Sequence, residues 1–267
     1  MSELVARSYG EHGPPLVVVH GGPGAPGGAA ALARELGETN RVLEPHQRLS
    51  GDAPLTVARH VADLREVIDR ELGDDERPAI VGTSWGAMLA LAFAAEHPGV
   101  ARALVLVGSG TFDEPSRAEF RRRLDERLGA RERAMLAALE QGPGSRDERL
   151  RAMASLVLPA YGHDVLPHDD ETVAYDARGN AEAWGDMIRL QADGTYPAAF
   201  ARIEVPVLML HGVDDPHPGE MIRASLAPHL KRLDFIELER CGHEPWFERH
   251  AREEFFDNLR GWLGALG

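Results

Sequence analysis

The chain has 267 residues, of which 43% are hydrophobic and 27% charged, which is enough for one large domain with an insertion. Its formal net charge of −14 disfavours binding to nucleic acid or to anionic lipid. No apolar run approaches the roughly 20 residues that cross a membrane. The opening Met1-Ser2-Glu3 lacks the basic and apolar regions of a secretory signal, so we expect a cytoplasmic protein. The single Cys241 can form no intramolecular disulfide and by itself no metal site.

Up to Gly110, short apolar runs alternate with helical patterns. The runs lack the alternation of a half-exposed strand, so they suit parallel strands covered by helices on both faces. Alternation of strand and helix favours right-handed βαβ units, and therefore a mostly parallel, doubly wound α/β sheet. The expected strands are 16–20, 41–44, 79–82 and 103–107, and the expected helices are 57–72, begun at Thr56, and 85–96.

The pattern changes after Gly110, because residues 111–196 contain no comparable strand run. Apolar residues recur there at helical spacing instead. Strand patterns return at 205–210 and 233–238, and a helix rich in aromatic residues closes the chain. We therefore predict an α/β core of residues 1–110 and 197–267, interrupted by a helical cap insertion over 111–196. An insertion of that length usually has a function of its own.

Gly82-Thr83-Ser84-Trp85-Gly86 matches the pattern G-x-S-x-G and lies between an expected strand and an expected helix. In that context the serine occupies a tight turn, where a side chain at either glycine would clash with neighbouring backbone. The turn exposes the hydroxyl, and the N-terminus of the helix favours negative charge that develops near it. Ser84 is therefore our candidate nucleophile.

His20-Gly21-Gly22-Pro23-Gly24 directly follows the first expected core strand. Its small residues allow backbone N–H groups to approach a substrate carbonyl. One N–H of this loop, together with that of Trp85, would form an oxyanion hole. The alternative is a plain turn without a role in chemistry.

A serine hydroxyl needs a base to accept its proton, and that base is usually a histidine oriented by a carboxylate. The chain order Ser, acid, His favours a histidine after a late strand. His243 lies just past the run 233–238 and before the final helix, which makes it our candidate. The alternatives after Ser84 are His211, His217, His229 and His250.

Two aspartates, Asp214 and Asp215, follow the expected strand 205–210. The carboxyl ends of strands are where the active-site groups of an α/β sheet gather. Either aspartate could orient the histidine, and the other would then cap the following segment. The residues alone leave this choice open.

The motifs resemble those of the proline iminopeptidase branch of the α/β-hydrolases, in which HGGPG and G-x-S-W-G occur together. The likeness covers residues 15–110 and 203–267, and Gln47-Arg48-Leu49-Ser50-Gly51 also resembles the QR-x-SG segment of that family. It implies an α/β-hydrolase fold, no cofactor or metal, and a small-molecule or short-peptide substrate. It also implies four site roles: oxyanion donors Gly22 and Trp85, acid Asp215 at the end of H-G-x-x-D, and base His243 in a G-H turn.

The chain departs from the family at two places. The first core strand begins as early as Leu16, so the opening antiparallel strands are expected to be reduced to one around residues 4–8. The insertion is also short. The family holds the free amino group of the substrate with cap carboxylates, and Glu182 is the candidate here, unless it is a solvated helix residue. Trp184 and Trp246 either line the acyl pocket or pack in the interior.

The sequence thus predicts a serine hydrolase that acts through an acyl-enzyme on a small amide or ester. Our first hypothesis for its activity is a proline iminopeptidase-like aminopeptidase. The alternatives are a carboxylesterase, thioesterase or lactonase that shares only the core. A third is a catalytically idle receptor for a small molecule, because the fold alone does not decide the activity.

Overall fold

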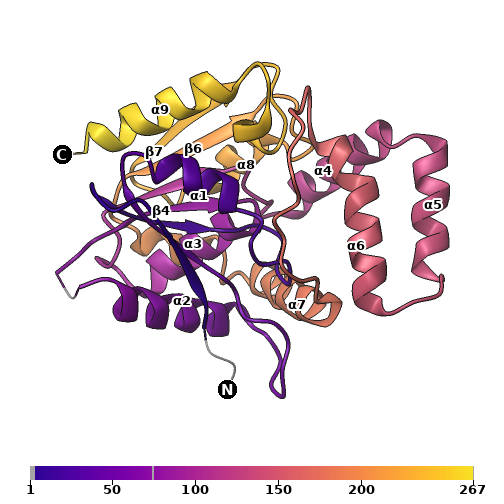
Figure 1. Ribbon diagram of the computed structural model, residues 1–267, viewed down its shortest axis with the longest axis horizontal. Helices are drawn as coiled ribbons and strands as arrows, with labels where there is room; N and C mark the ends of the chain where they lie inside the picture. Colours follow the sequence, from indigo (N-terminus) through magenta and orange to yellow (C-terminus); the bar gives the residue numbers. More distant parts are fainter. Residues whose placement is uncertain (1–3, 74, 267) are drawn as a thin grey trace.

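The computed structural model describes residues 4–73 and 75–266. Met1-Ser2-Glu3, where we expect no secretory signal, lies outside the described residues. Within them, one sheet has the order β1-β3-β2-β4-β5-β6-β7, and β1 alone runs antiparallel to its neighbour (Figure 1). The strands are β1 (Ala6–Tyr9), β2 (Pro15–Val19), β3 (Arg41–Pro45), β4 (Ala79–Thr83), β5 (Ala103–Val107), β6 (Val207–Gly212) and β7 (Leu233–Leu238).

Helices cover both faces of this sheet, as the unbroken apolar strands predict (Figure 1). Successive strand residues point to opposite faces: Val17 and Val19 join one buried cluster, while Leu16 and Val18 join the other. The first cluster packs against α2 (Val57–Glu71), α3 (Trp85–Glu96) and α8 (Gly219–Leu226), and the second against α1 (Ala30–Leu36) and α9 (Arg252–Gly264). The mostly parallel, doubly wound α/β sheet is therefore confirmed.

The predicted ends of several elements also agree with the structure. Thr56 caps α2, because its side chain accepts a hydrogen bond from the Arg59 N–H at 3.1 Å. The single opening strand is β1, which pairs with β3. The strand expected from Val205 begins only at Val207; the intervening Pro206 has no N–H to give to a neighbouring strand.

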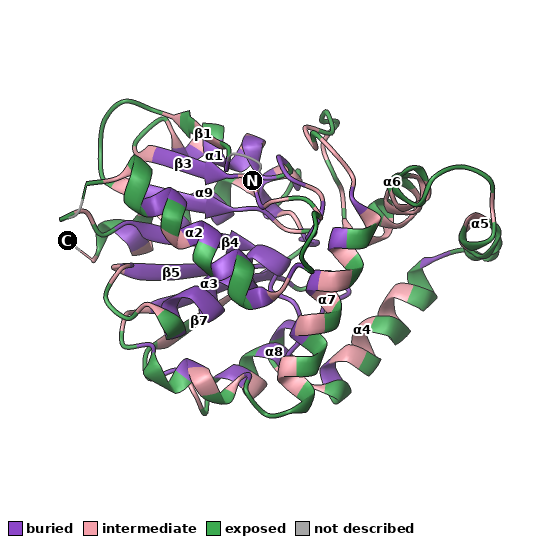
Figure 2. Cartoon of the chain, turned by 90° about the horizontal axis from the view of Figure 1, so that it is seen from below, coloured by how far each residue is buried: buried purple, intermediate pink, exposed green. Residues whose placement is uncertain are grey.

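Between β5 and β6 the chain forms a mainly helical segment. α5 and α6 lie at one end of the molecule, away from the sheet, and contain no buried residue among those described (Figure 2). In contrast, α7 buries Ala183 and Met187 against the core. The elements are α4 (Glu114–Arg127), α5 (Ala130–Glu140), α6 (Arg146–Val157), the 3₁₀ turn η1 (Leu158–Tyr161), α7 (Ala177–Ala192) and the 3₁₀ turn η2 (Ala198–Arg202). In the described parts of the chain, no helix has the length and hydropathy to span a membrane.

At the two glycines that flank the turn from β4 into α3, no residue larger than glycine fits. A Cβ atom at Gly86 would lie 2.1 Å from the Val19 carbonyl oxygen, and one at Gly82 would lie 2.4 Å from the Gly86 carbonyl oxygen. Both contacts are with backbone, which cannot move aside without shifting β2 or α3. The steric reason for the G-x-S-x-G spacing is thus present in the packing of this turn.

We expect Gly86→Ala to lower the free energy of unfolding by roughly 2–3 kcal/mol, because its methyl group overlaps the backbone of β2. Gly185→Ala is the matched control. Gly185 lies in the middle of α7, where an added Cβ would meet nothing within 4 Å among the described residues. We therefore expect this variant to raise the free energy of unfolding by about 0.5–1 kcal/mol. Urea unfolding of both variants measures the difference, and equal effects would contradict the steric explanation.

Candidate active site

Four loops meet at the carboxyl ends of β2, β4, β6 and β7, and they carry the residues that the motifs single out. His20 follows β2, Ser84 follows β4, Asp215 follows β6, and His243 follows β7. Because these strands run parallel in one sheet, with β5 between β4 and β6, their carboxyl ends lie along the same edge. The sheet therefore brings together residues that are far apart in sequence.

Ser84 has a strained backbone, with φ 51° and ψ −118°, directly before the first residue of α3. Its N–H donates to the Val107 carbonyl oxygen at 2.8 Å, which fixes the turn against β5. The side chain borders a cavity of about 560 Å³ that Gly22, His217 and His243 also line. The serine is thus presented to a space large enough for a small substrate.

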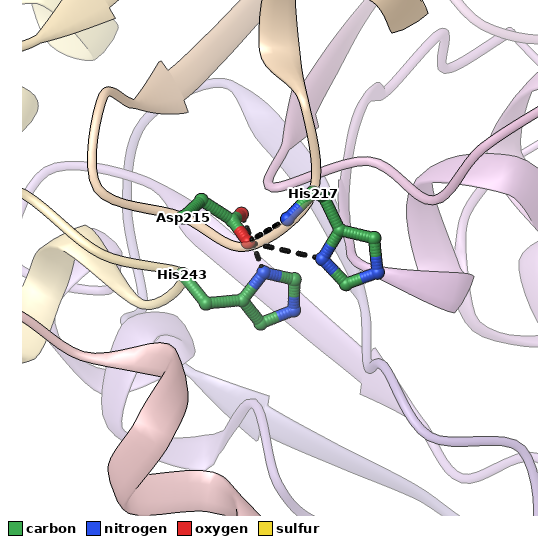
Figure 3. A group of neighbouring side chains, drawn as sticks. All are labelled: Asp215, His217 and His243. Atoms are coloured by element: carbon green, nitrogen blue, oxygen red, sulfur yellow. Dashed lines mark hydrogen bonds and ion pairs between the residues drawn. The ribbon is translucent and has the colours of Figure 1, made fainter. Parts of the chain in front are cut away.

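Asp215 and His243 form a short hydrogen bond, 2.6 Å between Oδ2 and Nδ1 (Figure 3). A carboxylate only accepts, so Nδ1 carries the hydrogen and Nε2 of a neutral His243 has the free lone pair. Burial by itself lowers the pKa of His243, but the charge of Asp215 and the hydrogen bond to it outweigh burial and leave the pKa raised. The bond therefore sets the tautomer and the basicity of this imidazole.

Asp214 is turned away from this pair. Its carboxylate lies 2.9 Å from Nδ1 of His163 and is about a third exposed. The structure thus places Asp215, the residue that the family likeness favours, against His243. It also keeps Asp215 fully buried and charged: burial raises the pKa of Asp215, but the neighbouring imidazoles of His243, His217 and His211 outweigh burial and hold it well below the usual range.

Two of the alternative histidines also contact Asp215. Nδ1 of His217 lies 3.0 Å from Oδ1, and Nε2 of His211 lies 3.3 Å from Oδ2. His211 is completely buried and its Nε2 is 2.9 Å from the His217 carbonyl oxygen, so it borders no open space. His250, another of the alternatives, lies beside Asp164 and not beside Asp215.

The loop after β2 is fixed by hydrogen bonds to Gln47. The Gln47 main-chain N–H donates to Nε2 of His20 at 3.0 Å, and its side-chain amide donates to the His20 carbonyl oxygen at 2.8 Å. The same side chain accepts from the indole N–H of Trp85 at 2.9 Å. Burial lowers the pKa of His20 to about 4, so this histidine is neutral. Gln47 therefore ties together the two loops that carry Gly22 and Trp85.

The two expected oxyanion donors, Gly22 and Trp85, lie on the loop after β2 and at the start of α3. Gly22 borders the cavity with a φ of 53°, which suits glycine. Trp85 begins α3, so its main-chain N–H is one of the first in the helix and has no partner within it. Its indole is buried and points to Gln47, away from the cavity.

The loop carrying His243 is held by Glu248, a residue that the motifs do not single out. This buried carboxylate accepts hydrogen bonds of 2.8 Å from the N–H groups of Gly242, His163 and Asp164. The N–H of His243 itself donates to the Tyr161 carbonyl oxygen at 2.9 Å. The histidine loop is thus bound to the segment after η1. Its only sequence signal is an acid five residues after His243.

The three cap candidates differ in placement. Trp184 and Trp246 line the cavity, and Trp184 also packs against Trp85 with ring centroids 5.0 Å apart. Glu182 is not among the described residues that line the cavity. Its carboxylate accepts a hydrogen bond from the Leu55 N–H at 2.8 Å, which ties α7 to the loop before α2. The expectation that Glu182 holds a substrate amino group has no support in this geometry.

Glu244 is the carboxylate that does border the cavity. It also lines a second space of about 400 Å³, which shares Tyr161 and His243 with the first. Burial raises the pKa of Glu244; the charges of His243 and His168 lower it, and those of Asp170 and Glu248 add smaller increases. A cation bound at this point would stabilise the ionised carboxylate.

Within the described residues, one group could offer a metal ion three ligand atoms within 4.8 Å of one another, namely Asp215, His217 and His243. The Nδ1 atoms of both histidines are engaged with the carboxylate, one with each oxygen. An ion would have to replace both hydrogens and separate these groups. Both oxygens of Asp215 already accept hydrogen bonds from these two residues.

Comparison with known proteins assigns the chain to a family. The model of the "Alpha/beta hydrolase family" matches residues 16–258. A proline iminopeptidase of Lactobacillus helveticus is 25% identical over 98% of this chain and 94% of its own length. A probable proline iminopeptidase of Streptomyces coelicolor is 33% identical over 73% of this chain, and the match spans 59% of that relative.

Solved structures agree on the fold. A thermophilic esterase from Thermogutta terrifontis superposes with a TM-score of 0.65 at 23% identity, over 98% of this chain and 93% of its own. The family match extends over most of the chain and contains all four loops of the site. The chain therefore belongs to the alpha/beta hydrolase family.

Proposed function

We propose that this protein is a serine hydrolase that cleaves a small amide or ester through an acyl-enzyme. One observation carries the proposal: Ser84, strained at the N-terminus of α3, shares a cavity with His243, and Asp215 fixes that imidazole with Nε2 free to accept a proton. An idle receptor would have no need of a strained serine beside an oriented base.

The chemistry follows from these positions. Ser84 Oγ attacks the substrate carbonyl carbon while Nε2 of His243 takes the hydroxyl proton. The N–H groups of Gly22 and Trp85 donate to the resulting oxyanion. His243 then gives the proton to the leaving amine or alcohol, the bond to it breaks, and an acyl group remains on Ser84. Water, deprotonated by His243, attacks the acyl carbonyl and releases the acid and the free serine.

We propose that residues 111–196 act as the cap over this site. Phe120, Leu158 and Ile188, from three parts of this segment, line the cavity that contains Ser84. The segment is also tied to the core, since Asp176 accepts hydrogen bonds from Ser50. Differences in this segment would therefore change the substrate without changing the reaction.

Aminopeptidase-like activity is the first candidate. The proline iminopeptidase relatives support it, and so does Glu244, a partly exposed carboxylate beside His243 whose charge would attract a substrate ammonium group. The second candidate is an esterase or lactonase. It is supported by the largely apolar wall formed by residues such as Leu158, Trp184 and Ile188, which an uncharged acyl chain would match.

Ser84→Ala should reduce turnover by roughly 10⁴-fold or more, because no other group forms the acyl-enzyme. The unfolding midpoint should change little, since a methyl-sized side chain fits the same turn. Labelling by a fluorophosphonate probe should be lost in the same variant. Full activity or persistent labelling after Ser84→Ala would refute the mechanism.

Asp215→Asn should lower kcat by about a thousandfold or more, because an amide can present its N–H to Nδ1 and so favour the wrong tautomer of His243. Asp214→Asn is the matched control, one residue away. Asp214 contacts His163 and not His243, so kcat of this variant should stay within about twofold of that of the unaltered protein. Steady-state rates on one aryl ester measure both, and equal losses would reject Asp215 as the acid.

Rates on proline 4-nitroanilide, its N-acetyl derivative and 4-nitrophenyl butyrate separate the two candidate substrates. We expect the free-amine arylamide to be cleaved faster than the acetylated one. Glu244→Gln should then reduce that preference about tenfold, through loss of a charge-assisted hydrogen bond. Turnover of the ester alone, with no arylamide cleavage, would favour the esterase candidate.

A further inference from the structure

His217 contacts the same carboxylate as His243 but through the other oxygen (Figure 3). Its ring Nδ1 lies 3.0 Å from Oδ1 of Asp215, and its main-chain N–H donates to that oxygen at 2.8 Å. Oδ2 receives His243 at 2.6 Å. One residue therefore supplies two donors to one oxygen, and the other oxygen faces the candidate base.

The ring of His217 is also fixed from both sides. It stacks on His243, with centroids 4.8 Å apart and planes at 26°, and on Phe120 of α4, with centroids 4.3 Å apart and planes at 15°. Its carbonyl oxygen lies 2.9 Å from Nε2 of His211, which holds the main chain. These contacts leave the ring little freedom to leave Asp215.

We propose that His217 is a positioning residue of this site: its two N–H groups hold Oδ1 of Asp215, so that Oδ2 is fixed in one orientation toward His243. The inference rests on the proposed function, because it assigns His217 a role in presenting the base to Ser84. The ring acts through its Nδ1 hydrogen, and its stacking on His243 is secondary.

The charges around the two imidazoles predict the direction in which the pKa of His243 changes when His217 is replaced. His217 faces Asp215, His211 and His243, with Tyr161 beside it, while Arg117 and Arg121 of α4 and Glu244 line the same cavity. Burial lowers the pKa of His217 despite the charge of Asp215, so its imidazole is neutral when His243 takes a proton. The Nδ1–H of His217 donates to Asp215 and so partly offsets its negative charge. Removing this donor strengthens the attraction between Asp215 and a protonated His243.

Two substitutions separate the donor from the ring. His217→Phe keeps a ring between Phe120 and His243 but has no hydrogen to donate. His217→Asn loses the ring but places an amide N–H where Nδ1 lies. We expect His217→Phe to lower kcat/KM on an aryl ester about tenfold, and His217→Asn to stay within about threefold. A role in packing alone would give the opposite order.

The pH profile gives a second readout. Activity falls as pH drops through the pKa of His243, because the protonated imidazole cannot accept the Ser84 proton. In His217→Phe this limb should move to higher pH by about 0.5 pH unit or more, and in His217→Asn it should stay in place. His12→Phe, at an exposed histidine that is not among the residues lining the cavity, is the control and should change neither rate nor profile.

NMR titration of the His243 ring decides the proposal without turnover. A higher pKa of His243 in His217→Phe, with no change in His217→Asn, supports it. An unchanged pKa and rate in His217→Phe, or equal losses in both variants, overturns it. If the unaltered protein neither turns over esters nor reacts with a fluorophosphonate, the proposed function fails while the titration still tests His217. Thermal unfolding confirms that each variant is folded.

Discussion

The buried charge of Asp215 is the constraint on which the site depends. A carboxylate with no exposed surface is stable only when donors surround it, and here the donors come from its own loop and from the loop after β7, with the His211 imidazole of β6 close by. Satisfying this charge fixes how the ends of β6 and β7 lie relative to each other. The orientation of the His243 imidazole is a consequence of that arrangement.

Other carboxylates join the helical segment to the core in the same way. Glu182 and Asp186 of α7 accept hydrogen bonds from the N–H groups of Leu55 and Val57, and Glu248 binds three N–H groups around the histidine loop. This explains why Glu182, expected to face a substrate, faces backbone instead. The cavity is bordered by α7 and by the histidine loop, two of the segments that these bonds hold in place.

Much of the fold could be predicted because its signals are local. Unbroken apolar runs indicated buried parallel strands, and the two glycines around Ser84 indicated a turn without room for side chains. The split between α4 and α5 was not predicted, since Leu124, Leu128 and Met135 keep a helical spacing across the break at Gly129. An apolar period shows which face is covered, but not where a helix ends.

The sequence by itself determined the core strands, the turn at Ser84 and the glycine loop after β2, because each depends on residues a few positions apart. Only the tertiary structure shows that Asp215, and not Asp214, contacts His243; it also places His217 on the same carboxylate and turns Glu182 to Leu55. The Asp215–His243 and Glu182–Leu55 contacts span 28 and 127 positions of the chain. Which way a side chain points at such a distance is set by packing and by the need to pair buried charge, which no local pattern records.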